Sequence, residues 1–235
     1  MKTEINRFVE TLQKALGSQL QSVIWYGPAC RNPDTAQPEE IQLLVIVDSL
    51  GVPELQALSE PVNRWIRKRH PFPKIFTRER LLKSTDVFPI ECLAVQSHYQ
   101  VMHGNDLVPE LSVSDANLRL QLESEFKGKL LQLREAFLIS GGKPKTLAQT
   151  LALSLPTFES LFAALARVLG QPAPTDAASA ASLLANQLKV QDAAVLADIQ
   201  QLRQGGASGD RQHIHKLFER YLRLIEQVSD KIDSL

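Results

Sequence analysis

The chain has 235 residues, with 26 lysines and arginines against 26 aspartates and glutamates, so its formal net charge is zero. Proteins dedicated to nucleic-acid binding usually carry a basic surplus, and this balance argues against that class. The only two cysteines, Cys30 and Cys92, exclude a disulfide scaffold and a cysteine-rich zinc module. The first residues lack the apolar core of a signal peptide, and no apolar run has the length of a membrane span. We therefore expect a cytoplasmic protein without membrane contact.

The first half of the chain mixes helix and strand patterns. Apolar residues recur at helical spacing from 5 to 16, and Gly17 is a natural stop. Residues 22–26 predict a buried strand, and the β-branched and leucine run at 41–47 predicts a strand buried on both faces. A helix opened by Gly51 and Pro53 is expected to run towards Arg69.

Further strands are expected before residue 112. The pattern predicts a short strand at 74–76 and a short helix at 77–83 capped by Thr77. Residues 88–96 alternate, with Glu91 on one face, and predict a third strong strand. Residues 99–103 predict an edge strand.

The second half of the chain shows only helical patterns. The expected helices cover 114–140, 145–155, 157–169, 177–188 and 190–204. A last helix, with an apolar stripe from Ile214 to Ile232, follows a glycine-rich loop at 205–209. The sequence thus predicts an α+β protein. Residues 1–112 form an α/β domain with a mixed sheet and flanking helices, and residues 113–235 form an all-helical bundle.

One strand–loop–strand segment has the pattern of an active-site motif. A strand ends in Tyr26-Gly27-Pro28, a loop follows, and a second strand carries Glu40-Ile41-Gln42 at its start. This arrangement resembles the polymerase-β-like nucleotidyltransferase superfamily. With the segments at 88–107 and 118–135, the plan is similar to the two-domain type of kanamycin nucleotidyltransferase.

The resemblance implies a defined active site. Members place Gly-Ser after the first strand, Asp-x-Asp on the second, and a third carboxylate on a later strand. Two Mg²⁺ ions bridge the triphosphate and the attacking hydroxyl, and alternate positions on a strand aim two carboxylates to one side. The glycine turn lets backbone N–H groups approach the phosphates.

This sequence departs from that motif at several positions. Pro28 stands where the serine is expected, Glu40 at the first aspartate and the neutral Gln42 at the second. Glu91 is the nearest candidate for the third carboxylate, although Ala94 is an equally good match and carries none. Replacing a carboxylate by an amide removes one unit charge beside a divalent ion. Each pair of unit charges is worth about 4 kcal/mol at 4 Å and an effective dielectric of 20, so this loss weakens metal binding by roughly a thousandfold or more.

We therefore predict a nucleotidyltransferase-like protein, catalytically degenerate, which binds a nucleotide, another small ligand or a protein partner in a cleft between its halves. Gly27 and Pro28 are the nucleotide-binding candidates, and no cofactor is expected. The alternative is an active Mg²⁺-dependent nucleotidyltransferase that modifies a small molecule or a protein, with Glu40 and Glu91 as metal ligands. A weaker alternative is an antitoxin-like or adaptor module. A homodimer is compatible with each.

Other polar features have plainer interpretations. The basic run from Arg64 to His70 fits the charged last turn of a helix, with Trp65 and Ile66 in the core, better than a nucleic-acid contact. His213 and His215 are two positions apart on a predicted helix and do not share a face.

Overall fold

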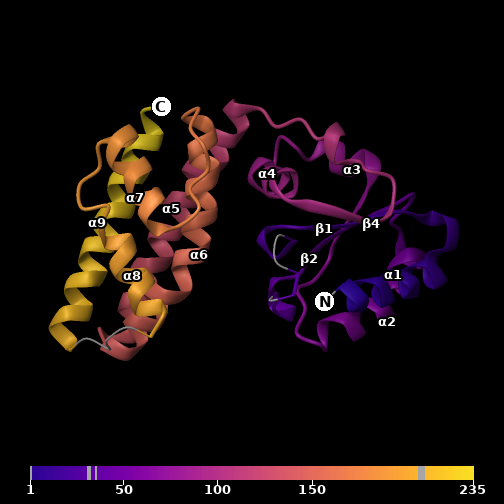
Figure 1. Ribbon diagram of the computed structural model, residues 1–235, viewed down its shortest axis with the longest axis horizontal. Coiled ribbons are helices and arrows are strands. Elements are labelled where there is room, and N and C mark those ends of the chain that lie inside the picture. The colour runs from indigo at the N-terminus through magenta and orange to yellow at the C-terminus, as the bar shows by residue number, and fades with distance from the viewer. Residues whose placement is uncertain (1, 31–32, 35, 206–209) are drawn as a thin grey trace. The chain divides into compact units, whose positions relative to one another are not determined.

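The computed structural model describes residues 2–30, 33–34, 36–205 and 210–235, and the chain divides into two compact units (Figure 1). Unit 1 is Met1–Ser114 and unit 2 is Asp115–Leu235. Unit 1 contains the sheet and unit 2 the long helices, which is the predicted α+β class. Each unit is described by itself below.

Unit 1 is built on a four-stranded mixed sheet in the order β3-β2-β1-β4. Its strands are β1 (Leu20–Tyr26), β2 (Gln42–Val47), β3 (Lys74–Thr77) and β4 (Tyr99–Gly104). β1 runs antiparallel to both β2 and β4, whereas β2 and β3 are parallel. The end of β1 therefore lies beside the starts of β2 and β4. The predicted pairing of the first two strands and the predicted edge strand at 99–103 are both confirmed.

Helices cover both faces of this sheet (Figure 1). On one side α1 (Lys2–Leu16) and α2 (Val52–Ile66) pack on odd-numbered strand residues such as Trp25 and Val45. On the other side α3 (Arg78–Lys83) and α4 (Pro89–Ser97) pack with even-numbered residues such as Ile24 and Leu44. This alternation is the two-residue period of a pleated strand. The Thr77 hydroxyl accepts a hydrogen bond from the backbone N–H of Arg80, which confirms the predicted cap of α3.

The predicted strand at 88–96 is wrong, because these residues form helix α4. Both faces of the supposed strand were apolar, so its alternation did not discriminate between strand and helix. The residues that α4 buries, Pro89, Cys92 and Val95, follow helical spacing of three. Pro89 occupies the first turn of α4, where its fixed φ favours a helix and its missing N–H costs nothing.

Unit 2 contains the remaining helices, and no strand occurs among its described residues. They are α5 (Asp115–Ser140), α6 (Pro144–Val168), α7 (Ala177–Leu183) with its π-helical extension Leu184–Leu188, α8 (Val195–Arg203) and α9 (Arg211–Asp233). α5 packs against α6 and α9. Phe126, Phe158 and Phe162 are fully buried between these helices, and Tyr221 meets Phe158 edge to face at 5.5 Å.

The long apolar stripes predict these helices well. Every residue of the stripe on α9, from Ile214 to Ile232, is buried. The separate helices predicted at 145–155 and 157–169 are instead one helix, α6, with Pro156 inside it. The stripe stays in phase across the proline, so burial of Leu155 and Phe158 offsets the lost hydrogen bond. α8 begins at Val195, later than the predicted 190, and residues 206–209 of the predicted glycine-rich segment lie outside the described residues.

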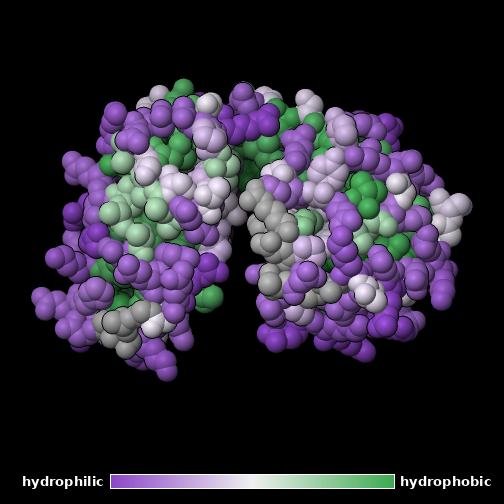
Figure 2. Space-filling model, viewed as in Figure 1, coloured by the Kyte–Doolittle hydropathy of each residue, from purple (hydrophilic) through white to green (hydrophobic). Residues whose placement is uncertain are grey.

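One described helix, α6, is long and apolar enough to cross a membrane by length and composition alone. Many of its apolar side chains form the core of unit 2, including Leu151 and Phe162, so the core accounts for this composition. On the viewed face of each unit hydrophilic residues predominate, and hydrophobic residues are exposed in separate patches (Figure 2).

Candidate functional site

The candidate site lies at one end of the sheet of unit 1, where β1 ends and β2 begins. Tyr26, the last residue of β1, pairs with Gln42 on one side and Tyr99 on the other. The backbone N–H of Gly27 donates to the carbonyl of His98 at 2.8 Å, which extends the pairing by one residue. The sheet register therefore places three strand ends side by side.

Gly27 and Gln42 are brought together, as the motif requires. Gly27 has a φ of +91°, a backbone conformation that glycine adopts without strain. A Cβ added at Gly27 would lie 3.8 Å from Cδ of Gln42, so the side chain of Gln42 lies on the side of Gly27 where a side chain would project. Pro28 begins a short 3₁₀ helix, η2 (Pro28–Cys30), and its side chain lies outside the described part of the structure.

Glu40 belongs to the turn before β2. It ends the 3₁₀ helix η3 (Pro38–Glu40), one turn ahead of the strand. Its Oε2 accepts a hydrogen bond from the backbone N–H of Gln37 at 2.9 Å. The carboxylate of Glu40 thus stabilises its own turn, and the predicted position at the start of the strand is wrong by two residues.

Glu91 is half-buried in the first turn of α4, so its predicted place on a strand is also wrong. The helix still brings it to the candidate site. Burial and the negative charge of Glu91 together raise the pKa of Tyr26 to about 12. Glu91 also helps to raise the pKa of Cys92. Its carboxylate therefore acts on the face of the sheet where Tyr26 and Gln42 lie.

One residue at this end of the sheet was not singled out from the sequence. Lys74, the first residue of β3, pairs with Leu44 of β2. Its positive charge lowers the pKa of Cys92, against the larger effect of burial. The signal that could have found Lys74 is the alternation Lys74-Ile75-Phe76, which puts lysine on the same face as Gln42 once β3 is paired with β2.

These residues do not fit a two-metal centre. Mg²⁺ prefers several carboxylate and carbonyl oxygens in near-octahedral geometry. At this end of the sheet Glu40 is bound to its own turn, Gln42 is neutral and Lys74 is a cation. Within the described ranges, no group of three or more His, Cys, Asp or Glu side chains is arranged to hold a metal ion.

In the basic run at the end of α2, Trp65 and His70 pack inside unit 1. The ring of Trp65 is stacked between Phe8 at 4.5 Å and His70 at 3.7 Å, and its Nε1 donates to the carbonyl of Pro71. Trp65 is therefore in the core, as predicted, and has no free face for a nucleic-acid base. Ile66 is 39% exposed, so its predicted place in the core is wrong.

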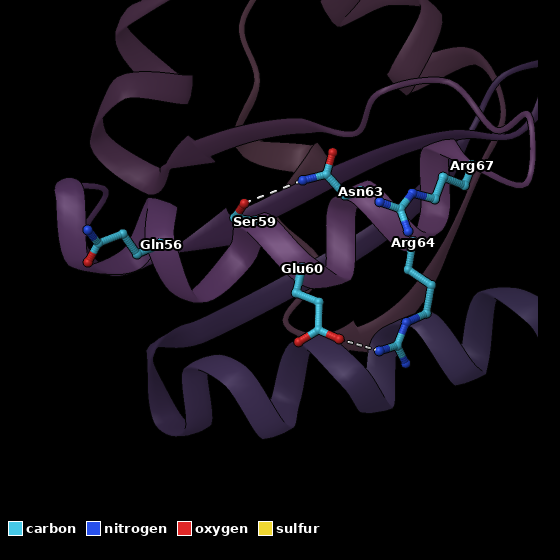
Figure 3. Close-up of a pocket in the computed structure, with 6 residues that line it drawn as sticks. All are labelled: Gln56, Ser59, Glu60, Asn63, Arg64 and Arg67. Carbon is cyan, nitrogen blue, oxygen red and sulfur yellow. Dashed lines mark hydrogen bonds and ion pairs between the residues drawn. The ribbon is translucent and has the colours of Figure 1, made fainter.

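A surface depression of about 470 Å³ follows the outer side of α2 (Figure 3). It is lined by Gln56, Ser59, Glu60, Asn63, Arg64 and Arg67. Five of these residues lie in α2, and Arg67 is its C-cap. The pairs Ser59–Asn63 and Glu60–Arg64 are each bonded across one helical turn (Figure 3). This is the ordinary pattern of a solvated helix face, and it includes none of the motif residues.

The histidine and cysteine candidates have structural roles. His215 Nε2 lies 2.6 Å from the carbonyl oxygen of Gly142 and links α9 to the turn between α5 and α6. Burial raises the pKa of the Cys30 thiol to about 12 and that of Cys92 to about 11. Neither cysteine has the lowered pKa of a nucleophile.

The fold, but not the sequence, is similar to that of a known protein. No protein-family model and no curated protein matches the sequence. The structure is similar to that of a spectinomycin adenyltransferase from Enterococcus faecialis, solved with ATP and spectinomycin, at a TM-score of 0.56 and 13% sequence identity. The match covers 93% of this chain and 98% of the other. The chain therefore shares the fold of this adenyltransferase, in agreement with the fold that the resemblance implied.

Proposed function

We propose that this protein binds a nucleotide at the end of the sheet where β1 ends and β2 begins, without transferring a nucleotidyl group. The observation that carries the proposal is the neutral Gln42 beside Gly27, while one carboxylate oxygen of Glu40 accepts a hydrogen bond from the backbone N–H of Gln37. The nucleotidyltransferase-like fold supports nucleotide binding, because the similar adenyltransferase was solved with ATP. A cytoplasmic location is part of the proposal.

The missing charge sets the size of the catalytic defect. One carboxylate beside a divalent ion contributes at least about 4 kcal/mol, the value for a single pair of unit charges at 4 Å and an effective dielectric of 20. That energy corresponds to roughly a thousandfold in rate or metal affinity. Gln42 is neutral, so the motif lacks one such charge. Glu40 lies in the turn before β2, where one of its carboxylate oxygens accepts a hydrogen bond from the backbone N–H of Gln37. We therefore expect no measurable transfer with Mg²⁺ or Mn²⁺.

The test is pyrophosphate release. The protein is incubated with Mg²⁺ or Mn²⁺, each labelled nucleoside triphosphate and candidate small-molecule acceptors including spectinomycin, with heat-denatured protein as the blank. We expect release at the level of the blank. A double variant, Glu40→Asp with Gln42→Asp, is expected to bind the metal–nucleotide complex more tightly than the unmodified chain.

An active nucleotidyltransferase is the second candidate, because the fold match covers nearly the whole of an adenyltransferase chain. It is favoured if the unmodified protein releases pyrophosphate and Glu40→Ala or Glu91→Ala abolishes that release. If the unmodified protein and the double variant both fail to bind nucleotide in equilibrium dialysis, nucleotide binding itself is wrong.

A further inference from the structure

Lys74 lies on the same face of the sheet as Gln42. In the parallel pairing of β2 and β3, Lys74 is opposite Leu44 and Phe76 is opposite Ile46. Leu44, Ile46 and Phe76 pack in one cluster under α3 and α4. Paired residues of neighbouring strands share a face, so Lys74 and Gln42 belong to that face too, at the end of the sheet where the cluster stops.

The ammonium group of Lys74 is available for a ligand. Lys74 is exposed, and among the described residues its side chain has no ion pair and no hydrogen bond. Two nearby cations on α3 behave differently, because Arg78 is paired with Glu110 and Lys83 with Glu79. Lys74 is thus an unneutralised positive charge at the candidate site.

The charges of Lys74 and Glu91 both act on Cys92, one of the buried residues of α4. The ammonium lowers the pKa of this thiol and the carboxylate raises it. Lys74 is therefore within electrostatic reach of the first turn of α4 as well as of the strand ends. A divalent cation at this place would be repelled by Lys74, whereas an anion would be attracted.

We propose that Lys74 supplies the positive charge with which this end of the sheet binds a phosphate chain, in place of a divalent metal ion. The inference rests on the proposed nucleotide-binding function. A lysine ammonium is a compact charge with three N–H donors on a flexible stem, which suits phosphate oxygens. The amide of Gln42, on the adjacent strand, offers further donors.

The proposal reverses the expected effect of Glu91. If a phosphate chain binds next to Lys74 without metal, the carboxylate of Glu91 opposes it, and Glu91→Gln strengthens binding. If Glu91 is a metal ligand, the same substitution weakens binding. The direction of this change separates the two arrangements and does not depend on any catalytic activity.

The experiment measures binding of ATP and of inorganic tripolyphosphate by equilibrium dialysis, first in EDTA and then in Mg²⁺. We expect the unmodified chain to bind both probes in EDTA, and Lys74→Met to bind them roughly tenfold more weakly, because the variant loses charge-assisted hydrogen bonds to the phosphate oxygens. Lys14→Met is the matched control, because Lys14 is exposed on α1, the helix that covers the opposite face. Binding to ATP alone would identify a nucleotide rather than a free polyphosphate as the ligand.

The outcomes are distinct. Weaker binding in Lys74→Met, unchanged binding in Lys14→Met and tighter binding in Glu91→Gln support the inference. Binding that needs Mg²⁺ and is unaffected by Lys74→Met overturns the inference but leaves nucleotide binding intact. Equal losses in both lysine variants indicate a non-specific charge effect and also overturn it. Failure to bind either probe under both conditions removes the inference and the proposed function together. Circular dichroism of each variant confirms that it is folded.

Discussion

Replacing Gly104 by alanine should severely destabilise unit 1. Gly104 ends β4 with a φ of +74° and pairs with Ser22 of β1. An added Cβ would lie 1.8 Å from the carbonyl oxygen of Gln21. Cβ contacts under 3.0 Å essentially do not occur, so the two backbones must separate by about 1.2 Å, the difference between these distances.

The expected loss of stability in Gly104→Ala has two contributions. The left-handed backbone conformation costs a residue with a side chain about 1–2 kcal/mol. Separating the strands also weakens the hydrogen bond from Asn105 N to Gln21 O at 3.3 Å and the two from the Ser22 hydroxyl, to His103 O at 3.2 Å and Asn105 O at 2.7 Å. Each is worth about 1 kcal/mol. The total is about 3 kcal/mol or more, a large fraction of the stability of a small domain.

The matched control is Gly17→Ala. Gly17 has a φ of +56° and nothing within 4 Å of an added Cβ, so this substitution carries the backbone cost without the steric clash. Both tryptophans of the chain, Trp25 and Trp65, are buried in unit 1, so urea unfolding followed by tryptophan fluorescence reports on this unit. We expect Gly104→Ala to lower the free energy of unfolding by at least about 2 kcal/mol more than Gly17→Ala does. Equal losses in the two variants would refute the close approach of β4 to Gln21.

Three further predictions concern individual side chains. Glu40→Ala removes the acceptor of a turn hydrogen bond and should cost about 1 kcal/mol in the urea unfolding of unit 1, with no change in pyrophosphate release. Arg220→Ala should cost unit 2 about 1–2 kcal/mol, measured by circular dichroism, because Arg220 holds the partly exposed Asp192 through two hydrogen bonds of 2.6 and 2.7 Å. The hydrogen bond from Arg220 lowers the pKa of Asp192, so this stability is present above the ordinary aspartate pKa of about 3.9 and is lost as pH falls through the lower folded pKa. The Arg220 variant should therefore lose less on acidification than the unmodified chain. Cys92, with a pKa of about 11, should react with iodoacetamide at pH 8 at least about a hundredfold more slowly than an unfolded thiol, as mass spectrometry of labelled peptides would show.

The elements that the sequence predicted best are those with long, one-sided apolar patterns. The stripe of α9 runs from Ile214 to Ile232, about five helical turns, and no strand interpretation fits it. The run at 41–47 is too short for a helix and rich in β-branched residues, so β2 was also clear. In α6 the proline at 156 predicted a break that the structure lacks, because the packing of a continuous stripe outweighs the cost of one missing hydrogen bond.

The candidate site was predictable to a different degree at each residue. Gly27 and Gln42 were placed correctly, because a strand, a turn and a second strand determine which ends meet. The prediction of a strand at 88–96 affected the site most. It placed Glu91 on a strand instead of on a helix, and it did not draw attention to β3, the strand next to β2 that carries Lys74. Short apolar segments with weak periodicity are decided by tertiary packing, here the burial of Cys92 and Val95 on the sheet.

The ligand preference expected at the candidate site depends more on the charges of its side chains than on the fold. A centre built for two divalent ions concentrates carboxylates and so repels a free triphosphate until the metal binds. Here one motif position is an amide, one carboxylate is held by its turn, and the residue on the neighbouring strand is a lysine. The amide and the lysine each make an anion easier to bind and a divalent cation harder to bind. They act in one direction, and so a nucleotide-fold protein with this set of side chains is expected to retain its ligand while losing the metal that would make the ligand react.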